Sequence, residues 1–311
     1  MQDDTVLPAI AGPTAVGKTA LALALARRRP VEIVSADSMQ VYRGLDAGTS
    51  KPSPEDRRAV PHHLIDVASP EERYDLARFL AEAARAIEDI RRRGRIPLVV
   101  GGTGLYLKGL AEGIFAVPSR DPQLRARLEE RARREGAAAL HAELGRVDPE
   151  AARRISPHDA IRIVRALEVY GVTGRPISHW QSDPRAPQTP AHPLRLVVLR
   201  RRREALNERI AVRVGAMLAA GWIEEVQELL DCGVDPRLHC FKALGYRRIA
   251  RALRGEQSME GLAEDIARET RQFAKRQMTW FRGMRGVAWL DLDRADLADP
   301  VAALEAELFS H

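Results

Sequence analysis

The octapeptide Gly12-Pro13-Thr14-Ala15-Val16-Gly17-Lys18-Thr19 decides the fold of this chain. It has the spacing G-x-x-x-x-G-K-T and lies between an apolar run at 9–11 and a segment of helical composition at 20–26. In such a setting backbone N–H groups turn toward a phosphate, and the following helix adds its positive dipole end at the same point. Lys18 supplies a point charge, and the Thr19 hydroxyl is a candidate ligand of Mg²⁺. The stretch predicts a nucleotide-type loop for a polyphosphate or pyrophosphate, without indicating which one.

Alternating strand and helix patterns surround this loop. Apolar runs at 31–34, 96–100 and 194–199 read as strands, with shorter ones at 62–67 and 287–290, and 74–93 has helical periodicity. This alternation is typical of an α/β fold, a parallel sheet with helices on both faces. Ligands of such sheets bind at the carboxyl ends of the strands.

The pattern changes between about 118 and 193. Residues 122–136, 137–145 and 159–170 have helical character with no strand among them, and 183–193 contains four prolines. We therefore predict an all-helical insertion at 118–193 in an α/β core made of 1–117 and 194–311.

Composition narrows the class of protein. A chain of 311 residues with 45% apolar content can bury a full core, but it has no run of about 18 apolar residues and begins with acidic ones. We expect no membrane span. Two cysteines, Cys232 and Cys240, give no disulfide framework and no four-ligand zinc cluster, which favours a reduced, cytoplasmic enzyme. The net charge of +6 and pI near 9.7 indicate a polyanionic partner.

Lysine is scarce in this arginine-rich sequence. Only five of the 49 basic residues are lysine, at positions 18, 51, 108, 242 and 275. A lysine retained against such a bias indicates a place where a planar guanidinium does not substitute.

Asp37 is the second candidate site residue. It follows a predicted strand by three residues and has Ser35 and Ser38 beside it. It is a candidate Mg²⁺ ligand, a candidate general base, or the cap of a following helix. Thr103 ends another strand. An ATPase often carries a metal-binding aspartate at that place, and the absence of an acid here argues against ordinary ATP hydrolysis. Asp66 stays open as a substitute metal ligand.

Residues 268–285 form the third candidate element. They carry six basic side chains against one acid, with aromatic and apolar residues interleaved at helical spacing. The pattern predicts a helix with one face on the core and the other facing either phosphates or solvent. No duplex-binding motif is present, so structured or single-stranded RNA is the expected target. Residues 242–247 and the pair Arg162 and Arg165 add basic elements.

Together these motifs resemble one family, the bacterial tRNA dimethylallyltransferases, also called isopentenyl-tRNA transferases. The resemblance covers nearly the whole chain. It rests on GPTAVGKT (12–19), SADSMQVY (35–42), GTSKP (48–52), PHHLID (61–66), IPLVVGGTGLY (96–106), RALEVY (165–170), KALGYR (242–247) and AKRQMTWFR (274–282). It implies a P-loop NTPase-like core with a helical insertion.

The resemblance also implies the reaction. The five-carbon group of dimethylallyl diphosphate would pass to N6 of the adenosine 3′-adjacent to the anticodon, giving N6-(dimethylallyl)adenosine and diphosphate. The substrates would be tRNAs that read codons beginning with U, bound at the anticodon stem-loop and flipped at that adenosine. The chain is expected to use Mg²⁺ and to act as a monomer.

The resemblance assigns roles residue by residue. Residues Gly12 to Thr19 would bind the diphosphate, with Thr19 on the metal, and Asp37, Lys18 and Thr103 would be catalytic, Asp37 as the general base. The tRNA-contacting positions would be Asp37, Ser38, Met39, Gln40, Thr103, Arg125, Ile161, Arg162, Ile163, Val164, Arg165, Lys242, Ala243, Leu244, Gly245, Tyr246, Arg247, Lys275, Arg276, Gln277, Met278, Thr279, Trp280, Phe281 and Arg282.

Three alternatives compete with this interpretation. A P-loop kinase of a small molecule or nucleotide needs neither the helical insertion nor the basic C-terminal helix. An enzyme that prenylates free AMP leaves the same segments unused. A non-catalytic RNA-binding module does not need Lys18, Thr19 and Asp37 together. The sequence does not say whether Arg200 to Arg203 touch RNA or cover a strand end.

Overall fold

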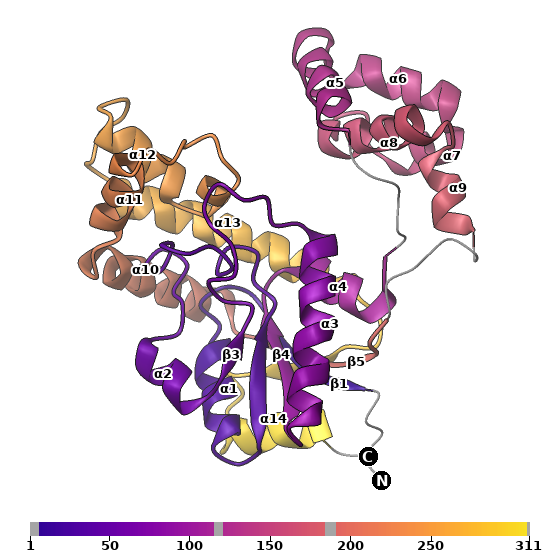
Figure 1. Cartoon of the computed structure of the whole chain (residues 1–311). Helices are drawn as coiled ribbons and strands as arrows, with labels where there is room; N and C mark the ends of the chain where they lie inside the picture. The colour runs from indigo at the N-terminus through magenta and orange to yellow at the C-terminus, as the bar shows by residue number, and fades with distance from the viewer. Residues whose placement is uncertain (1–5, 115–120, 184–190, 310–311) are drawn as a thin grey trace. The chain divides into compact units, whose positions relative to one another are not determined.

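The structure of the chain, a computed structural model, describes residues 6–114, 121–183 and 191–309 (Figure 1). It divides into two compact units, residues 1–112 with 190–311, and residues 113–189. The second unit covers most of the insertion predicted at 118–193, and the predicted start at 118 lies outside the described residues. None of the helices described is long and apolar enough to cross a membrane.

A wholly parallel six-stranded sheet is the centre of the first unit. Its strands are β1 (Leu7–Ala11), β2 (Val31–Ser35), β3 (His62–His63), β4 (Ile96–Gly101), β5 (Leu194–Arg200) and β6 (Ala288–Asp291). The order is β3-β2-β4-β1-β5-β6, so β1 is an interior strand with Ala9 beside Val99 and Leu196. Every residue of β1 is buried, which explains its continuous apolar run. The predicted α/β fold is confirmed.

Helices cover both faces of this sheet. The connections β1 to β2 and β3 to β4 run in opposite directions across the sheet. Since such crossovers are right-handed, they place α1 (Lys18–Ala26) and α3 (Leu76–Arg92) on opposite faces. α14 (Pro300–Phe309) packs beside α1, and α4 (Gly104–Glu112) beside α3 (Figure 1).

Four more helices of the first unit come from the C-terminal third: α10 (Arg203–Ala219), α11 (Trp222–Asp231), α12 (Tyr246–Leu253) and α13 (Leu262–Arg282). The 3₁₀ turn Cys240–Lys242 lies between α11 and α12, and the short helix α2 (Pro54–Ala59) follows β2. α10 packs along α13, and α11 against α12. Trp222 and Tyr246, both fully buried, meet edge to face between α11 and α12. α10 and α13 frame the site described below.

The second unit is entirely helical in its described part. It contains α5 (Pro122–Glu135), α6 (Ala137–Val147), α7 (Pro149–Arg154), α8 (Ala160–Thr173) and α9 (Ile177–Ser182). Its core is a cluster that includes Leu128, Leu140, Leu144, Ile163 and Leu167. The patterns predicted at 122–136, 137–145 and 159–170 correspond to α5, α6 and α8.

One predicted strand is much shorter than expected. The run at 62–67 is extended only at His62 and His63. Leu64 and Asp66 have positive φ values of 64° and 58°, a left-handed backbone that ends the strand. The turn that replaces it carries Asp66 into a polar network described below.

Candidate functional site

The loop between β1 and α1 has the geometry that its spacing predicts. Gly12 has φ +143°, and a Cβ atom there would lie 2.7 Å from the carbonyl oxygen of Leu199 on β5. Glycine is therefore required at this position both for backbone conformation and for space. Gly17 caps the N-terminus of α1 in a left-handed conformation, so the first turn of the helix opens into the loop.

Lys18 closes this loop from inside. Its Nζ donates to the carbonyl oxygens of Gly12 and Pro13, at 3.0 and 2.9 Å. The side chain keeps some access to a cavity, yet desolvation by the surrounding protein is the main cause that lowers the pKa of Lys18 to about 7. The positive charge of Arg213 lowers this pKa further, and Asp37 opposes the change. A bound anion would offset the burial and the charge of Arg213, which both disfavour the protonated form of Lys18.

Two arginines of α10 join the loop and were missed from the sequence. Arg209 Nε donates to the carbonyl oxygen of Ala15 at 2.9 Å, and Arg213 Nε to Ser50 Oγ at 3.0 Å. Burial lowers the pKa of Arg213, against the influence of Asp37. The two arginines are four residues apart, so one helix face carries both, and this i, i+4 spacing was the available signal.

Asp37 lies in a turn directly after β2 and caps no helix. Its Oδ1 accepts from the backbone N–H of Met39 at 2.9 Å, with a longer contact of 3.4 Å from that of Gln40. Among the described residues, only Oδ1 of this carboxylate is engaged in hydrogen bonds. The other oxygen is thus free to act on a substrate that enters the site.

Thr103 braces this turn from the next strand. Its Oγ1 accepts from the backbone N–H of Ser38 at 3.1 Å, and its own N–H donates to the carbonyl oxygen of Ala36 at 3.2 Å. Both bonds flank Asp37. The structure therefore places Thr103 where it fixes the carboxylate.

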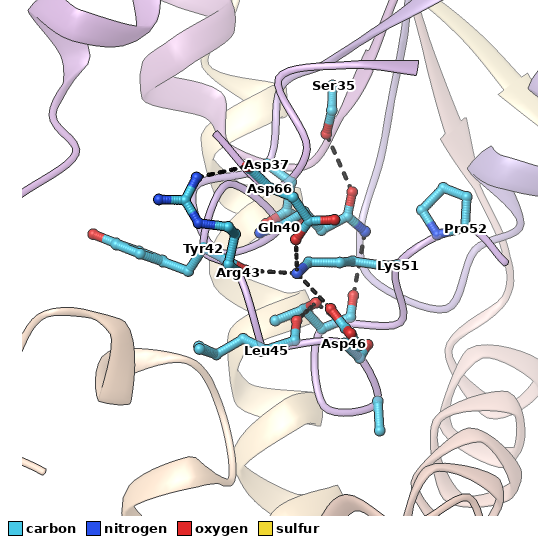
Figure 2. A network of polar contacts seen from close by, with 12 residues as sticks. Ser35, Asp37, Gln40, Tyr42, Arg43, Leu45, Asp46, Lys51, Pro52 and Asp66 are labelled. Atoms are coloured by element: carbon cyan, nitrogen blue, oxygen red, sulfur yellow. Dashed lines mark hydrogen bonds and ion pairs between the residues drawn. The ribbon is translucent and has the colours of Figure 1, made fainter. Parts of the chain in front are cut away.

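A loop at 42–51 forms a third wall, organised by Lys51 (Figure 2). The Lys51 side chain is 2% exposed, and its Nζ lies 2.5 to 2.6 Å from Tyr42 O, Asp46 Oδ1 and Asp66 Oδ1. Ser50 next to it has a strained φ of 47°. Its carbonyl oxygen accepts from Gln40 Nε2 at 3.3 Å, which holds the loop toward β2.

Asp66 belongs to this network and not to a metal site. Oδ1 pairs with Lys51, and Oδ2 pairs with Arg57 Nη1 at 2.6 Å. Burial favours the neutral acid, but these two bonds hold the pKa of Asp66 below its usual range. With both oxygens engaged, Asp66 is a structural anion.

These walls enclose a cavity of about 820 Å³, within the range of small-ligand sites. Lys18, Asp37, Thr103, Arg213 and Gln277 all line it. Of the predicted loop, Thr14, Ala15, Gly17 and Thr19 also reach it, whereas Gly12, Pro13 and Val16 do not. The structure thus brings the predicted catalytic residues and the loop together in one place.

A Mg²⁺ ion fits the chemistry of this cavity. Within the described ranges, no group of three or more His, Cys, Asp and Glu side chains is placed to hold a metal. The hydroxyl of Thr19 and the carboxylate of Asp37, however, line the same cavity. Mg²⁺ usually keeps several waters and takes one or two protein ligands with substrate phosphates, so the Thr19 hydroxyl together with a bound diphosphate would suffice.

The predicted RNA-contacting residues of the first unit differ in burial. Lys242, Arg247, Lys275, Arg276 and Arg282 are exposed, and none forms an ion pair within the part of the chain that the structure describes. By contrast, the side chains of Ala243, Tyr246, Gln277 and Phe281 are buried. The side chains of the exposed members of this set are the ones accessible to an RNA.

The predicted contacts in the helical unit divide in the same way. Ile161 and Arg162 are exposed, whereas Ile163 and Val164 belong to its core. Glu168, fully buried on α8, pairs through Oε2 with Arg165 Nη1 at 2.8 Å and Arg125 Nη1 at 3.2 Å. Arg125 and Arg165 thus pair with a buried carboxylate, and the Arg162 side chain is more exposed to solvent than either of them.

Of Arg200 to Arg203, the first three cover a strand end, and Arg203 begins α10. Arg200 pairs with Asp291 at 3.2 Å, and Arg201 with Asp293 at 2.6 Å, at the end of β6. Arg201 Nε also donates to the carbonyl oxygen of Val16, behind the loop. Arg201 thus supports the phosphate-type loop from outside the cavity.

The sequence of this chain matches two family models and several known proteins. The IPP transferase model matches residues 40–284, and the isopentenyl transferase model matches residues 5–66. A tRNA dimethylallyltransferase of Syntrophobacter fumaroxidans is 50% identical over 282 residues, which cover 91% of this chain and 82% of that protein. One from Geobacter metallireducens is 48% identical, with coverage of 93% and 94%.

Solved structures show the same fold. The full-length tRNA isopentenylpyrophosphate transferase of Bacillus halodurans aligns with a TM-score of 0.70 at 36% identity, over 98% of this chain and 97% of that one. A eukaryotic dimethylallyltransferase, captured acting on tRNA, aligns with a TM-score of 0.82 at 29% identity, over 96% and 77%.

Proposed function

The chain belongs to the IPP transferase family, and from this premise we propose that it transfers the dimethylallyl group of dimethylallyl diphosphate to a tRNA adenosine. The acceptor is N6 of the adenosine 3′-adjacent to the anticodon, in tRNAs that read codons beginning with U. The products are N6-(dimethylallyl)adenosine and diphosphate. The tRNA substrate implies a cytoplasmic setting.

One observation carries this proposal. A phosphate-type loop with Lys18 and a free carboxylate oxygen of Asp37 line a single cavity. The loop is suited to a leaving diphosphate, and the carboxylate to an attacking amine. A kinase could use the same loop and a similarly placed carboxylate, but it would not require the helical unit or the exposed cations of α13.

The reaction then follows from these groups. The N6 amine is a weak nucleophile because its lone pair is delocalised into the adenine ring. As the bond from N6 to the allylic carbon forms, the bond from that carbon to diphosphate oxygen breaks, and its electron pair leaves with the diphosphate. Asp37 accepts the proton lost by N6. Lys18 and Arg213 stabilise the growing negative charge, which is the larger contribution.

A bound Mg²⁺ would be held by Thr19 and the diphosphate, with Asp37 within the same cavity, and would neutralise charge on the leaving group. The residues of the chain still provide orientation. The backbone N–H groups of the loop and the N-terminus of α1 face the anion, and the apolar lining excludes water from the allylic carbon.

The tRNA would bind over the exposed cations of α13 and of residues 242–247. Lys275, Arg276 and Arg282 have no acidic partner within the described part of the chain, so their charge is available for phosphates. In the helical unit Ile161 and Arg162 are the accessible residues of the predicted set. Flipping the adenosine costs a few kcal/mol, less in an anticodon loop than in a duplex.

The test is incubation of the protein with unmodified tRNA and labelled dimethylallyl diphosphate, followed by nucleoside analysis. We expect one labelled N6-(dimethylallyl)adenosine per modified tRNA, and none with free AMP. Consumption of ATP without alkylation of adenosine would instead support a kinase.

The variant Asp37→Ala should reduce single-turnover transfer by about 10²-fold or more while tRNA binding persists, because the base is lost and the RNA surface is intact. Rapid quench gives the rate and filter binding the affinity. Glu55→Ala, which removes an exposed carboxylate from the first turn of α2, is the control. Equal transfer rates in Asp37→Ala and the parent would remove Asp37 from the role of base.

A further inference from the structure

Gln277 is a polar side chain on the buried face of α13, with Ala274 one turn before it and Phe281 one turn after it. Lys275 and Arg276 before it are exposed, whereas Gln277 retains 7% of its accessible surface. Its Oε1 accepts from the backbone N–H of Thr14 at 2.9 Å, and its Nε2 donates to the carbonyl oxygen of Gly102 at 2.9 Å. One side chain thus joins the phosphate-type loop to the end of β4.

A carboxamide satisfies both partners whatever the pH, whereas a carboxylic acid does so only when it is protonated. The Thr14 N–H is a donor and requires an acceptor, whereas the Gly102 carbonyl requires a donor, so the orientation of the amide follows from its neighbours. An ionised carboxylate would place an acceptor against the Gly102 carbonyl oxygen. An aliphatic side chain would leave both buried backbone groups without a partner.

Gly102 leaves the space that this bridge needs. A Cβ atom at Gly102 would lie 2.4 Å from Gln277 Nε2, so no other residue admits the amide without displacement. In an ATPase, the strand at this position often leads directly to a metal-binding acid. The role of Gly102 here is to let α13 approach the strand end.

The bridge connects the two chemical halves of the site. Beyond Gly102, Thr103 bonds to the backbone of Ala36 and Ser38, the two neighbours of Asp37. A continuous line of hydrogen bonds therefore runs from the loop, through Gln277 and Thr103, to the turn that carries Asp37.

We propose that Gln277 is a positioning residue for the transfer reaction, which fixes the diphosphate loop relative to the Asp37 turn, and that it does not read tRNA. The inference rests on the proposed function. Since a misplacement of about 1 Å can cost 10²-fold in rate, losing either hydrogen bond should slow the chemical step more than it weakens binding of tRNA.

The experiment compares the parent with Gln277→Leu and Gln277→Glu in single-turnover transfer at saturating tRNA and donor. We expect both variants to lose about 10²-fold in rate, with the tRNA dissociation constant within about twofold of the parent. Gln227→Leu, which removes an amide on the outer part of α11, should match the parent.

A pH series on Gln277→Glu separates positioning from folding. A protonated glutamic acid has one acceptor and one O–H donor, as the amide does, and burial favours that neutral form. Its rate relative to the parent should therefore recover as the pH falls from 8 to 6, while Gln277→Leu stays low. Thermal melting identifies any variant that is unfolded, and the pH series is measured only on variants that are folded.

The outcomes are distinct. A parent that alkylates no adenosine overturns the proposed function and this inference with it. An active parent with unchanged transfer in both variants overturns the inference alone. So does a tenfold weaker tRNA affinity with normal transfer of bound tRNA, because Gln277 would then be an RNA contact.

Discussion

Lys18 and Lys51 are both enclosed by protein, but their surroundings are opposite. Lys51 lies between the carboxylates of Asp46 and Asp66, with a backbone carbonyl as third acceptor. Lys18 has only two backbone carbonyls and stands beside the cation Arg213. The first ammonium is neutralised within the chain, and the second is not. We therefore expect the anionic ligand beside Lys18, which forms no ion pair within the described residues and has only the charge of Asp37, beyond ion-pair distance, to offset its own.

The largest effect should come from Lys18→Met. The variant removes a charge that stabilises the departing diphosphate, so we expect transfer to fall by about 10²- to 10³-fold. Stability should not fall, because a desolvated ammonium without an anionic partner is removed. Rapid-quench assays and thermal melting measure the two quantities. A marked loss of stability would show that Lys18 is a structural cation like Lys51.

Lys51→Met should show the reverse pattern. It leaves Asp66 facing Arg57 alone and removes the bonds to Asp46 and to the carbonyl oxygen of Tyr42, so we expect a loss of about 3 kcal/mol in the free energy of unfolding. Chemical denaturation measures it, with exposed Lys108→Met as control. Transfer per folded molecule should fall less than in Lys18→Met. A variant as stable as the parent would contradict the role assigned to this ion-pair network.

The pH dependence of donor binding sharpens the comparison. In the free protein Lys18 loses its proton near pH 7, whereas a bound diphosphate holds the ammonium charged, so binding takes up a proton above that pH. Affinity should fall as pH rises from 7.5 to 9, by up to about tenfold per unit. Calorimetry in buffers of different ionisation enthalpy measures the proton uptake. The Lys18→Met variant should take up no proton, and equal uptake there would reject this assignment.

The smallest effect is expected for Arg276→Ala on the exposed face of α13. One unpaired cation is lost, so tRNA affinity should fall several-fold, and the slope of log K against log salt should decrease by about one. Transfer from bound tRNA should change little. Binding at 50 to 200 mM salt tests this, with Arg237→Ala, whose side chain pairs with Asp235, as control. An unaltered slope would exclude a phosphate contact.

Sequence spacing predicted the parts of the site that lie within one local motif. The loop at 12–19, the strand ends and Asp37 each have a local signature, because glycine spacing and apolar runs encode backbone shape directly. The scarcity of lysine was informative at Lys51, where three acceptors within 2.6 Å suit a compact ammonium better than a planar guanidinium. It was not informative at Lys108, which is exposed and 3.8 Å from Glu112.

The parts that sequence reasoning missed depend on tertiary packing. Arg213 was not predicted, and Gln277 was predicted only as a tRNA contact. Both reach the cavity because α10 and α13 pack together, and no local pattern encodes that packing. The strand predicted at 62–67 stopped at His63 for a similar reason. Its last residues adopt positive φ so that Asp66 can pair with Lys51 and Arg57, and this pairing outweighs β propensity.

The bond between Thr14 and Gln277 has a consequence for biosynthesis. These partners are 263 residues apart, and β1 pairs with β5 only after residue 198 has been made. At about 5–20 residues per second, a ribosome needs roughly 13 to 50 s to deliver the second partner after the first. A nascent chain therefore carries an unfinished donor cavity for most of its synthesis.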